Sequence, residues 1–167
     1  MRDTIARQSG VDKDSIKYEV EPGNAKYRTG TITFAMQKGK SLDLARLHDD
    51  LIHTRLGKGT NSGVNSFQIT ATGEVTVVDK TPFLKVSGAR DKFTLADDPK
   101  AKPKEGAKTP YQRLQEALAK GQKVLSVTGR LQSWSGKWPA TLRALSEEIK
   151  ANKPTVLIVT NFETAAR

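Results

Sequence analysis

The chain has 167 residues, 28 of them basic and 18 acidic, which gives a formal net charge of +10, and it contains no cysteine. The lack of cysteine excludes a disulfide framework, a thiolate zinc site, a CxxC motif and a thiol nucleophile. No apolar run approaches the roughly 20 residues that a membrane span needs, so we expect no transmembrane segment. No apolar segment typical of a signal peptide follows Met1.

The positive charge is spread along the chain rather than gathered in one arm, apart from a short run of lysines between residues 100 and 108. A field of this sign favours anionic partners, such as nucleic acid or an acidic protein. A net charge of this size also keeps a small protein in solution without any specific partner. Composition therefore leaves the partner open.

The first part of the chain, residues 14–64, predicts a β-β-α unit. Met1 to Asp12 shows no sustained period and is expected to fray. Period-two alternation predicts the strands, and leucines at helical spacing predict the helix. The predicted elements are strands over 15–20 and 31–36 and a helix that begins after an N-cap at Ser41, carries Leu56 on its apolar stripe and ends just before Gly57.

The second part, residues 65–163, predicts a unit that is mostly sheet. Short strands separated by turn residues indicate an antiparallel meander, and Thr109-Pro-Tyr-Gln112 forms a capping box at a helix start. The predicted strands cover 64–78, 83–86, 93–95, 124–131 and 156–159, and the predicted helices 109–121 and 139–151. Residues 97–109 lack apolar anchors and predict a mobile linker.

The order β-β-β-α-β-(α)-β is the connectivity of the five-stranded OB-type barrel, and an ordinary mixed sheet is the alternative. Two predicted strands share a pattern, apolar-x-x-Thr-Gly-x-apolar. It occurs in Ile69-Thr-Ala-Thr-Gly73-Glu-Val75 and in Leu125-Ser-Val-Thr-Gly129-Arg-Leu131. A glycine inside a strand often marks a bulge or a bend, so we expect one at each glycine.

The sequence carries no recognised catalytic motif, and we expect neither an enzyme nor a cofactor. The two histidines, His48 and His53, are five residues apart on one predicted helix, which is the wrong spacing to chelate one metal ion. Asp49 and His53 have the i,i+4 spacing of a helical pair. Asp97-Asp98 and Glu147-Glu148 are adjacent in sequence and show no pairing across elements. A site assembled from distant segments stays open.

The segment Arg130 to Trp138 is the best candidate for recognition. Its two tryptophans and two basic residues suit base stacking and phosphate contacts. In an OB-type barrel the loop between the fourth and fifth strands binds ligands. The alternative is that both tryptophans fill one end of the core. The whole candidate surface for an anionic ligand or nucleic acid consists of Lys85, Arg90, Lys92, Arg130, Trp134, Lys137 and Trp138.

Residues 15–78 resemble a heavy-metal-associated domain of the ferredoxin-like class. The resemblance rests on Gly30-Thr-Ile-Thr-Phe34, on Leu44-Ala-Arg-Leu47-x-x-x-Leu51 and on Ile69-x-Ala-x-Gly73-x-Val75. That family binds soft metals through a CxxC, where this chain reads Met36-Gln-Lys-Gly-Lys-Ser41, so the resemblance carries no metal role. The pairing with an OB-like unit resembles small bacterial exported proteins.

Together these observations predict an α+β protein with a ferredoxin-like half, residues 14–64, and an OB-like five-stranded antiparallel barrel, residues 65–163. The predicted function is a non-catalytic binding or interaction module. The alternative is an OB-type protein that binds single-stranded nucleic acid. We expect a soluble protein, periplasmic if a signal peptide was removed and cytoplasmic otherwise. Cysteine content fits either compartment.

Overall fold

The structure, a computed structural model, describes residues 1–20, 30–56, 60–61, 64, 66–88, 92–103, 106–132 and 155–165. The chain divides into two units, Met1–Gly63 and Val64–Arg167. Both units contain helices and strands, and strands predominate, so the expected α+β class is confirmed. No helix among the described residues is long and apolar enough to cross a membrane.

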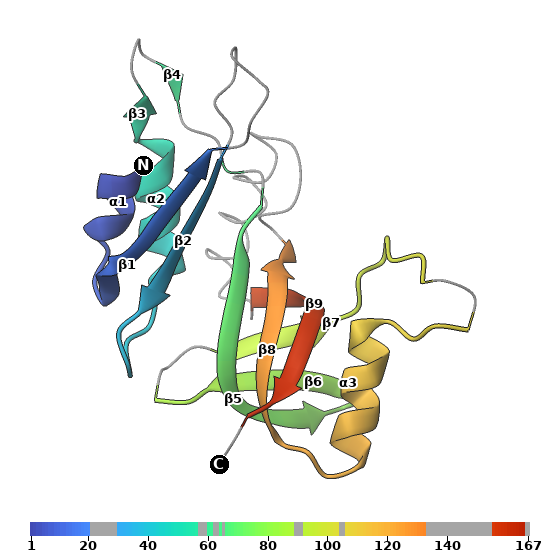
Figure 1. The fold of residues 1–167 in the computed structure, drawn as a ribbon. Helices are drawn as coiled ribbons and strands as arrows, with labels where there is room; N and C mark the ends of the chain where they lie inside the picture. The colour runs from blue at the N-terminus through green and yellow to red at the C-terminus, as the bar shows by residue number, and fades with distance from the viewer. Residues whose placement is uncertain are drawn as a thin grey trace. The chain divides into compact units, whose positions relative to one another are not determined.

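In the first unit, β1 and β2 form an antiparallel hairpin, α1 lies against β1, and α1 also contacts α2 (Figure 1). The elements are α1 (Arg2–Ala6), β1 (Val11–Val20), β2 (Gly30–Met36), α2 (Leu44–Ile52), β3 (Arg55–Leu56) and β4 (Thr60–Asn61). The short strands β3 and β4 pair with each other. The buried apolar side chains of this unit are Ile5, Val11, Ile16, Leu47 and Leu51.

The first residues of the chain pack into this core, which corrects the expectation that they fray. Ile5 is 5% exposed and Gln8 is 4% exposed. The side-chain amide of Gln8 donates to Asp50 Oδ2 over 2.6 Å and to the Thr4 carbonyl oxygen over 3.1 Å. The Oγ1 atoms of Thr4 and Thr54 lie 2.8 Å apart. A helix as short as α1 shows no measurable hydrophobic period, so the sequence pattern does not reveal it. Contacts with residues that are distant in the sequence hold it in place.

The helix α2 starts later and ends earlier than the sequence predicts. Its N-cap is Asp43 instead of Ser41, because the Asp43 carboxylate accepts the backbone N–H of Arg46 over 2.9 Å. Serine and aspartate are comparable caps, so residue type alone does not choose between them. Leu56, expected on the apolar stripe of this helix, belongs to β3.

The second unit is built on a five-stranded sheet with one helix (Figure 1). The elements are β5 (Gln68–Val78), β6 (Thr81–Val86), β7 (Lys92–Ala96), α3 (Pro110–Ala119), β8 (Val124–Leu131) and β9 (Thr155–Thr164). The strand order is β5-β6-β7-β9-β8, and β5 also pairs with β8, so the circuit of strand pairs closes. The pair β7 and β9 is parallel, which corrects the expectation of an entirely antiparallel sheet. The chain passes through α3 and β8 before it returns beside β7, and such a crossover joins parallel strands.

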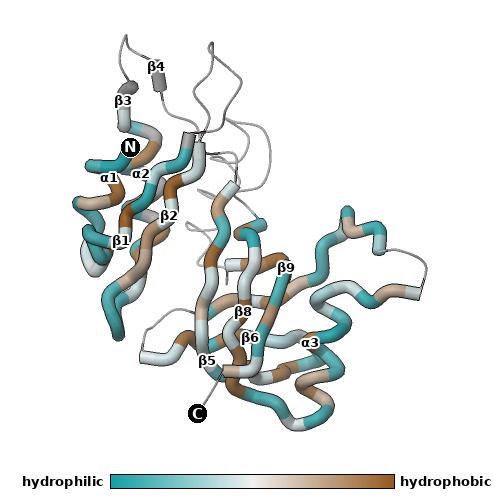
Figure 2. The backbone as a smooth tube through the Cα atoms, in the orientation of Figure 1, coloured by the Kyte–Doolittle hydropathy of each residue, from teal (hydrophilic) through white to brown (hydrophobic). Residues whose placement is uncertain are grey.

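One face of this sheet forms the core of the second unit. Figure 2 shows apolar and polar residues alternating along β5 and β8, the pattern of strands buried on one side only. Its fully buried side chains include Leu84, Leu95, Leu125, Val127, Leu131, Leu157 and, from α3, Leu114. The predicted capping box is confirmed: Thr109 Oγ1 accepts the Gln112 N–H, and the Gln112 side chain accepts the Thr109 N–H. The predicted helix over 139–151 lies outside the described residues.

Gly73 and Gly129, the two glycines of the shared sequence pattern, leave no room for a Cβ atom beside the neighbouring strand. Gly73 pairs with residues of both β6 and β8. A Cβ atom at Gly73 would lie 2.0 Å from the carbonyl oxygen of Lys85, and one at Gly129 would lie 2.6 Å from that of Ile158. The register between β8 and β9 also shifts at Gly129. The expected irregularity is therefore confirmed at Gly129, whereas the register of β5 with β6 and β8 runs without a shift through Gly73.

Candidate functional site

The strands β6 and β7 bury alternate residues and expose the others. Pro82 and Leu84 of β6, like Phe93 and Leu95 of β7, point into the core. Successive side chains of a strand point to opposite faces, so the intervening residues lie on the outer face. Four of these, which we call the basic face, are Phe83, Lys85, Lys92 and Thr94.

The basic face places two ammonium groups on directly opposed residues. Lys85 pairs with Lys92, and Phe83 pairs with Thr94. Both lysines are exposed. Like charges directly opposite one another on an antiparallel pair destabilise it, and Glu74 of β5, directly opposite Lys85 on its other side, offsets part of this repulsion.

An aromatic ring lies within reach of this charge. The Nζ atom of Lys92 is 4.4 Å from the centre of the Phe83 ring, a cation–π distance. Phe83 is half-buried, and the Lys92 ammonium lies over its ring. The basic face therefore offers positive charge and an aromatic surface side by side.

Arg130 lies on β8, which is separated from β7 by one strand, β9. Ala96, at the end of β7, pairs with Ile158 of β9, which in turn pairs with Arg130 of β8. The Nη2 atom of Arg130 donates to Asp98 Oδ2 over 2.8 Å, and the two side chains are 33% and 26% exposed. This cation already has a carboxylate partner, whereas within the described parts of the chain no salt bridge involves Lys85 or Lys92.

The two adjacent aspartates hold the start of the segment 97–109. Asp98 contacts β8 through Arg130. Asp97 Oδ2 accepts the hydroxyl of Thr109 over 3.1 Å, and Thr109 is the N-cap of α3. The segment thus begins and ends at nearly the same place. The predicted mobility of its middle stays a prediction.

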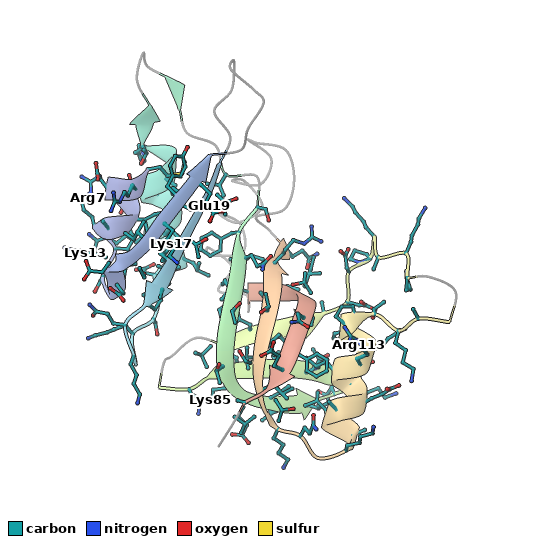
Figure 3. The ribbon with its side chains drawn as sticks, viewed as in Figure 1. Arg7, Lys13, Lys17, Glu19, Lys85 and Arg113 are labelled. Atoms are coloured by element: carbon teal, nitrogen blue, oxygen red, sulfur yellow. The ribbon has the colours of Figure 1, made fainter. Side chains whose placement is uncertain are left out.

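The structure brings together only part of the predicted surface. Lys85 and Lys92 lie opposite each other, whereas Arg130 is separated from them by β9. Figure 3 shows Lys85 and Arg113, a basic residue of α3, on well-separated parts of the second unit. The predicted residues Arg90, Trp134, Lys137 and Trp138 lie outside the described residues.

Sequence reasoning missed two residues of the surface, Phe83 and Asp98. The alternation Phe83-x-Lys85 would have placed the ring on the same face as the lysine, so period two was the available signal. The partner of Arg130 is 32 positions away in the chain, and no local pattern indicates that contact.

The histidine region of α2 offers no sign of a metal centre. His53 Nδ1 lies 3.5 Å from Asp49 Oδ1, which confirms the expected i,i+4 pair, and 2.8 Å from the Asp49 carbonyl oxygen. The side chain of His48 is outside the described part of the chain. Among the described side chains, no three or more of His, Asp and Glu gather in a way that could hold a metal ion.

Comparison with models of known protein families, with curated proteins and with solved structures finds no match. The function is therefore argued from the chemistry of the surface itself.

Proposed function

We propose that the second unit is an OB-like module that binds single-stranded nucleic acid on the basic face and catalyses no reaction. The support for an OB-like assignment is the closed circuit of strand pairs, the parallel pair β7 and β9, and the helix α3 between β7 and β8. In OB-type barrels the face of the second and third strands binds oligonucleotides and oligosaccharides. In this unit those two strands are β6 and β7.

The observation that carries the proposal is the opposition of Lys85 and Lys92 beside the Phe83 ring. A phosphate between the two ammonium groups would neutralise their repulsion. Unpaired bases expose flat π surfaces that stack on aromatic rings, whereas the bases of a duplex are already stacked on each other. The combination of charge and ring therefore favours a single strand over a duplex or a simple anion.

For the first unit we propose an interaction module related to the ferredoxin-like heavy-metal-associated domains, without metal binding. The β1–β2 hairpin followed by α2 supports this relationship, and the lack of cysteine removes the family's metal ligands. An interaction module with an acidic protein as its ligand is the alternative for the chain as a whole. It would use the same positive charge but would not need an accessible ring.

Fluorescence anisotropy with a labelled oligothymidylate at low salt tests the proposal. We expect saturable binding that weakens as salt rises, because each phosphate contact releases counterions. Lys92→Gln should reduce the slope of log affinity against log salt by about 0.7, the value for one contact with a single strand. Phe83→Leu should cost about 1–3 kcal/mol of binding, the range for one stacked base.

Arg113→Gln is the matched control, because it removes one positive charge from α3, away from the basic face. It should change affinity much less than Lys92→Gln. If no saturable binding occurs at low salt, or if the Arg113 and Lys92 variants weaken binding equally, the proposal is wrong.

A further inference from the structure

We propose that Glu74 makes the nucleic-acid site selective for guanine, by accepting hydrogen bonds from the edge of a base that lies on Phe83. This inference rests on the proposed function and names the base that the site prefers. It adds one strand, β5, to the basic face of β6 and β7.

Glu74 lies on the same outer face of the sheet as the basic face. Its neighbours along β5, Gly73 and Val75, are buried, so the Glu74 side chain points to the opposite face and is exposed. Glu74 pairs directly with Lys85 of β6, and Lys85 pairs with Lys92 of β7. One row of residues across three strands therefore runs from a carboxylate to two ammonium groups.

The next row of this face holds the aromatic ring between two hydroxyl groups. Phe83 pairs with Thr76 of β5 on one side and with Thr94 of β7 on the other. Glu74 is two residues from Thr76 along β5, so it is a diagonal neighbour of Phe83. Diagonal neighbours lie about 7–8 Å apart, within reach of a long side chain. The Glu74 carboxylate can therefore meet the edge of a base that covers this ring.

The order of charges across the face orients the ligand. The two ammonium groups attract phosphates toward β6 and β7, and the carboxylate of Glu74 repels them from β5. In the free protein the Lys92 ammonium lies over the Phe83 ring. An exposed cation–π contact is weaker than a hydrogen bond between an ammonium and a phosphate, so a bound phosphate draws this ammonium off the ring. A base then covers the ring with its outer edge toward β5.

The Glu74 carboxylate is available for such a contact. Within the described parts of the chain no salt bridge involves Glu74, although Lys85 is directly opposite it. On its other side Glu74 pairs with Val124 of β8, an exposed apolar residue whose side chain has no hydrogen-bonding group. The two carboxylate oxygens can therefore accept hydrogen bonds from a ligand.

Guanine is the base whose edge fits a carboxylate. A carboxylate only accepts hydrogen bonds, and its two oxygens suit two parallel donors. The Watson–Crick edge of guanine presents two adjacent donors, the ring N1–H and the exocyclic amino group. Adenine and cytosine present an amino group beside an acceptor nitrogen, and thymine and uracil present one N–H between two carbonyl oxygens. This edge of guanine is free only where the base is unpaired, which agrees with a single-stranded ligand.

Fluorescence anisotropy at low salt tests the inference with two labelled strands, oligothymidylate and the same strand with one central guanine. The wild-type chain should bind the guanine strand about five- to tenfold tighter, the lower part of the range for a bidentate base contact, because Glu74 is exposed. Inosine at the same position lacks the exocyclic amino group and should lose most of this gain. The inosine comparison uses the wild type alone, so it stands whatever a substitution does to folding.

Two matched variants locate the effect. Glu74→Gln should abolish the guanine preference, because an amide turns its own donor toward one of the two donors of guanine. The control is Glu163→Gln, which also removes one exposed negative charge. Glu163 lies on β9 and pairs with Ser126 of β8, so β8 separates it from β5. Both variants should raise the affinity for any strand, but Glu163→Gln should keep the guanine preference.

The outcomes separate this inference from the proposed function. If the wild type binds the strands with and without guanine equally, if inosine binds as tightly as guanine, or if Glu74→Gln keeps the preference, the selectivity is refuted and the binding function stands. If no strand binds at low salt, the proposed function fails and this inference fails with it. A guanine preference that is lost in Glu74→Gln and kept in Glu163→Gln supports the inference.

Discussion

Replacing Gly73 by alanine tests the closure of the five-stranded sheet. Gly73 of β5 pairs with β6 on one side and with β8 on the other. A Cβ there would lie 2.0 Å from the carbonyl oxygen of Lys85 and 2.9 Å from the Cα of Val86. These are backbone atoms, so no side-chain rotation relieves the clash, and one strand has to move.

The expected loss follows from that geometry. Overpacking a well-packed site costs typically about 1–3 kcal/mol, and the upper end applies where backbone has to shift. For a unit of about 100 residues each kcal/mol lowers Tm by roughly 4–8 °C. Gly73→Ala should therefore lower the Tm of the second unit by roughly 10–20 °C.

Differential scanning calorimetry of the full chain measures this loss, with Gly121→Ala as the control. Gly121 has a φ of +85° and nothing within 4 Å of an added Cβ, so its replacement costs conformational strain without a clash. That strain is about 1 kcal/mol. If Gly73→Ala costs no more than Gly121→Ala, the strands do not approach as closely as described, and the reasoning fails.

Two further predictions concern a turn and a half-buried phenol. Asp79 and Lys80 both have positive φ, 48° and 66°, as a type I′ turn requires. Because glycine adopts positive φ without strain, Lys80→Gly should stabilise the second unit by about 0.5–1 kcal/mol in urea unfolding. A loss of stability would contradict the turn assignment. Burial, and after it the charge of Asp97, raises the pKa of Tyr111 above its ordinary value near 10, so the folded protein holds this proton longer than the unfolded chain. The stability that comes from this shift is complete below about pH 10 and is lost as pH rises through the raised pKa. Tyr111→Phe should therefore lose less stability than the wild type in thermal melts at alkaline pH. Equal losses in the two proteins would refute the role of Tyr111.

The parts of the fold that were predictable are those with local signals. Thr109 and Gln112 are three residues apart and form the capping box that their sequence predicts. Gly73 and Gly129 interrupt otherwise β-rich segments, and close approach of a neighbouring strand explains each interruption. A capping box and a glycine within a strand each depend on residues that are close together in the sequence, so a local pattern is enough to predict them.

The parts that were missed depend on contacts between distant residues. The N-terminal helix is held by the Gln8 amide on Asp50, 42 positions away. The basic residues of the candidate site were predictable from charge, but the opposition of Lys85 and Lys92 depends on the register of β6 and β7. No local pattern specifies that register, because the hairpin turn between these strands leaves several pairings open.

An NMR titration of the full chain with oligothymidylate at low salt tests the central claim most directly, because it locates the ligand. The account predicts that the largest amide shifts fall on β6 and β7, around Phe83, Lys85 and Lys92. Shifts confined to the first unit, or spread evenly over the exposed lysines of the chain, would contradict it.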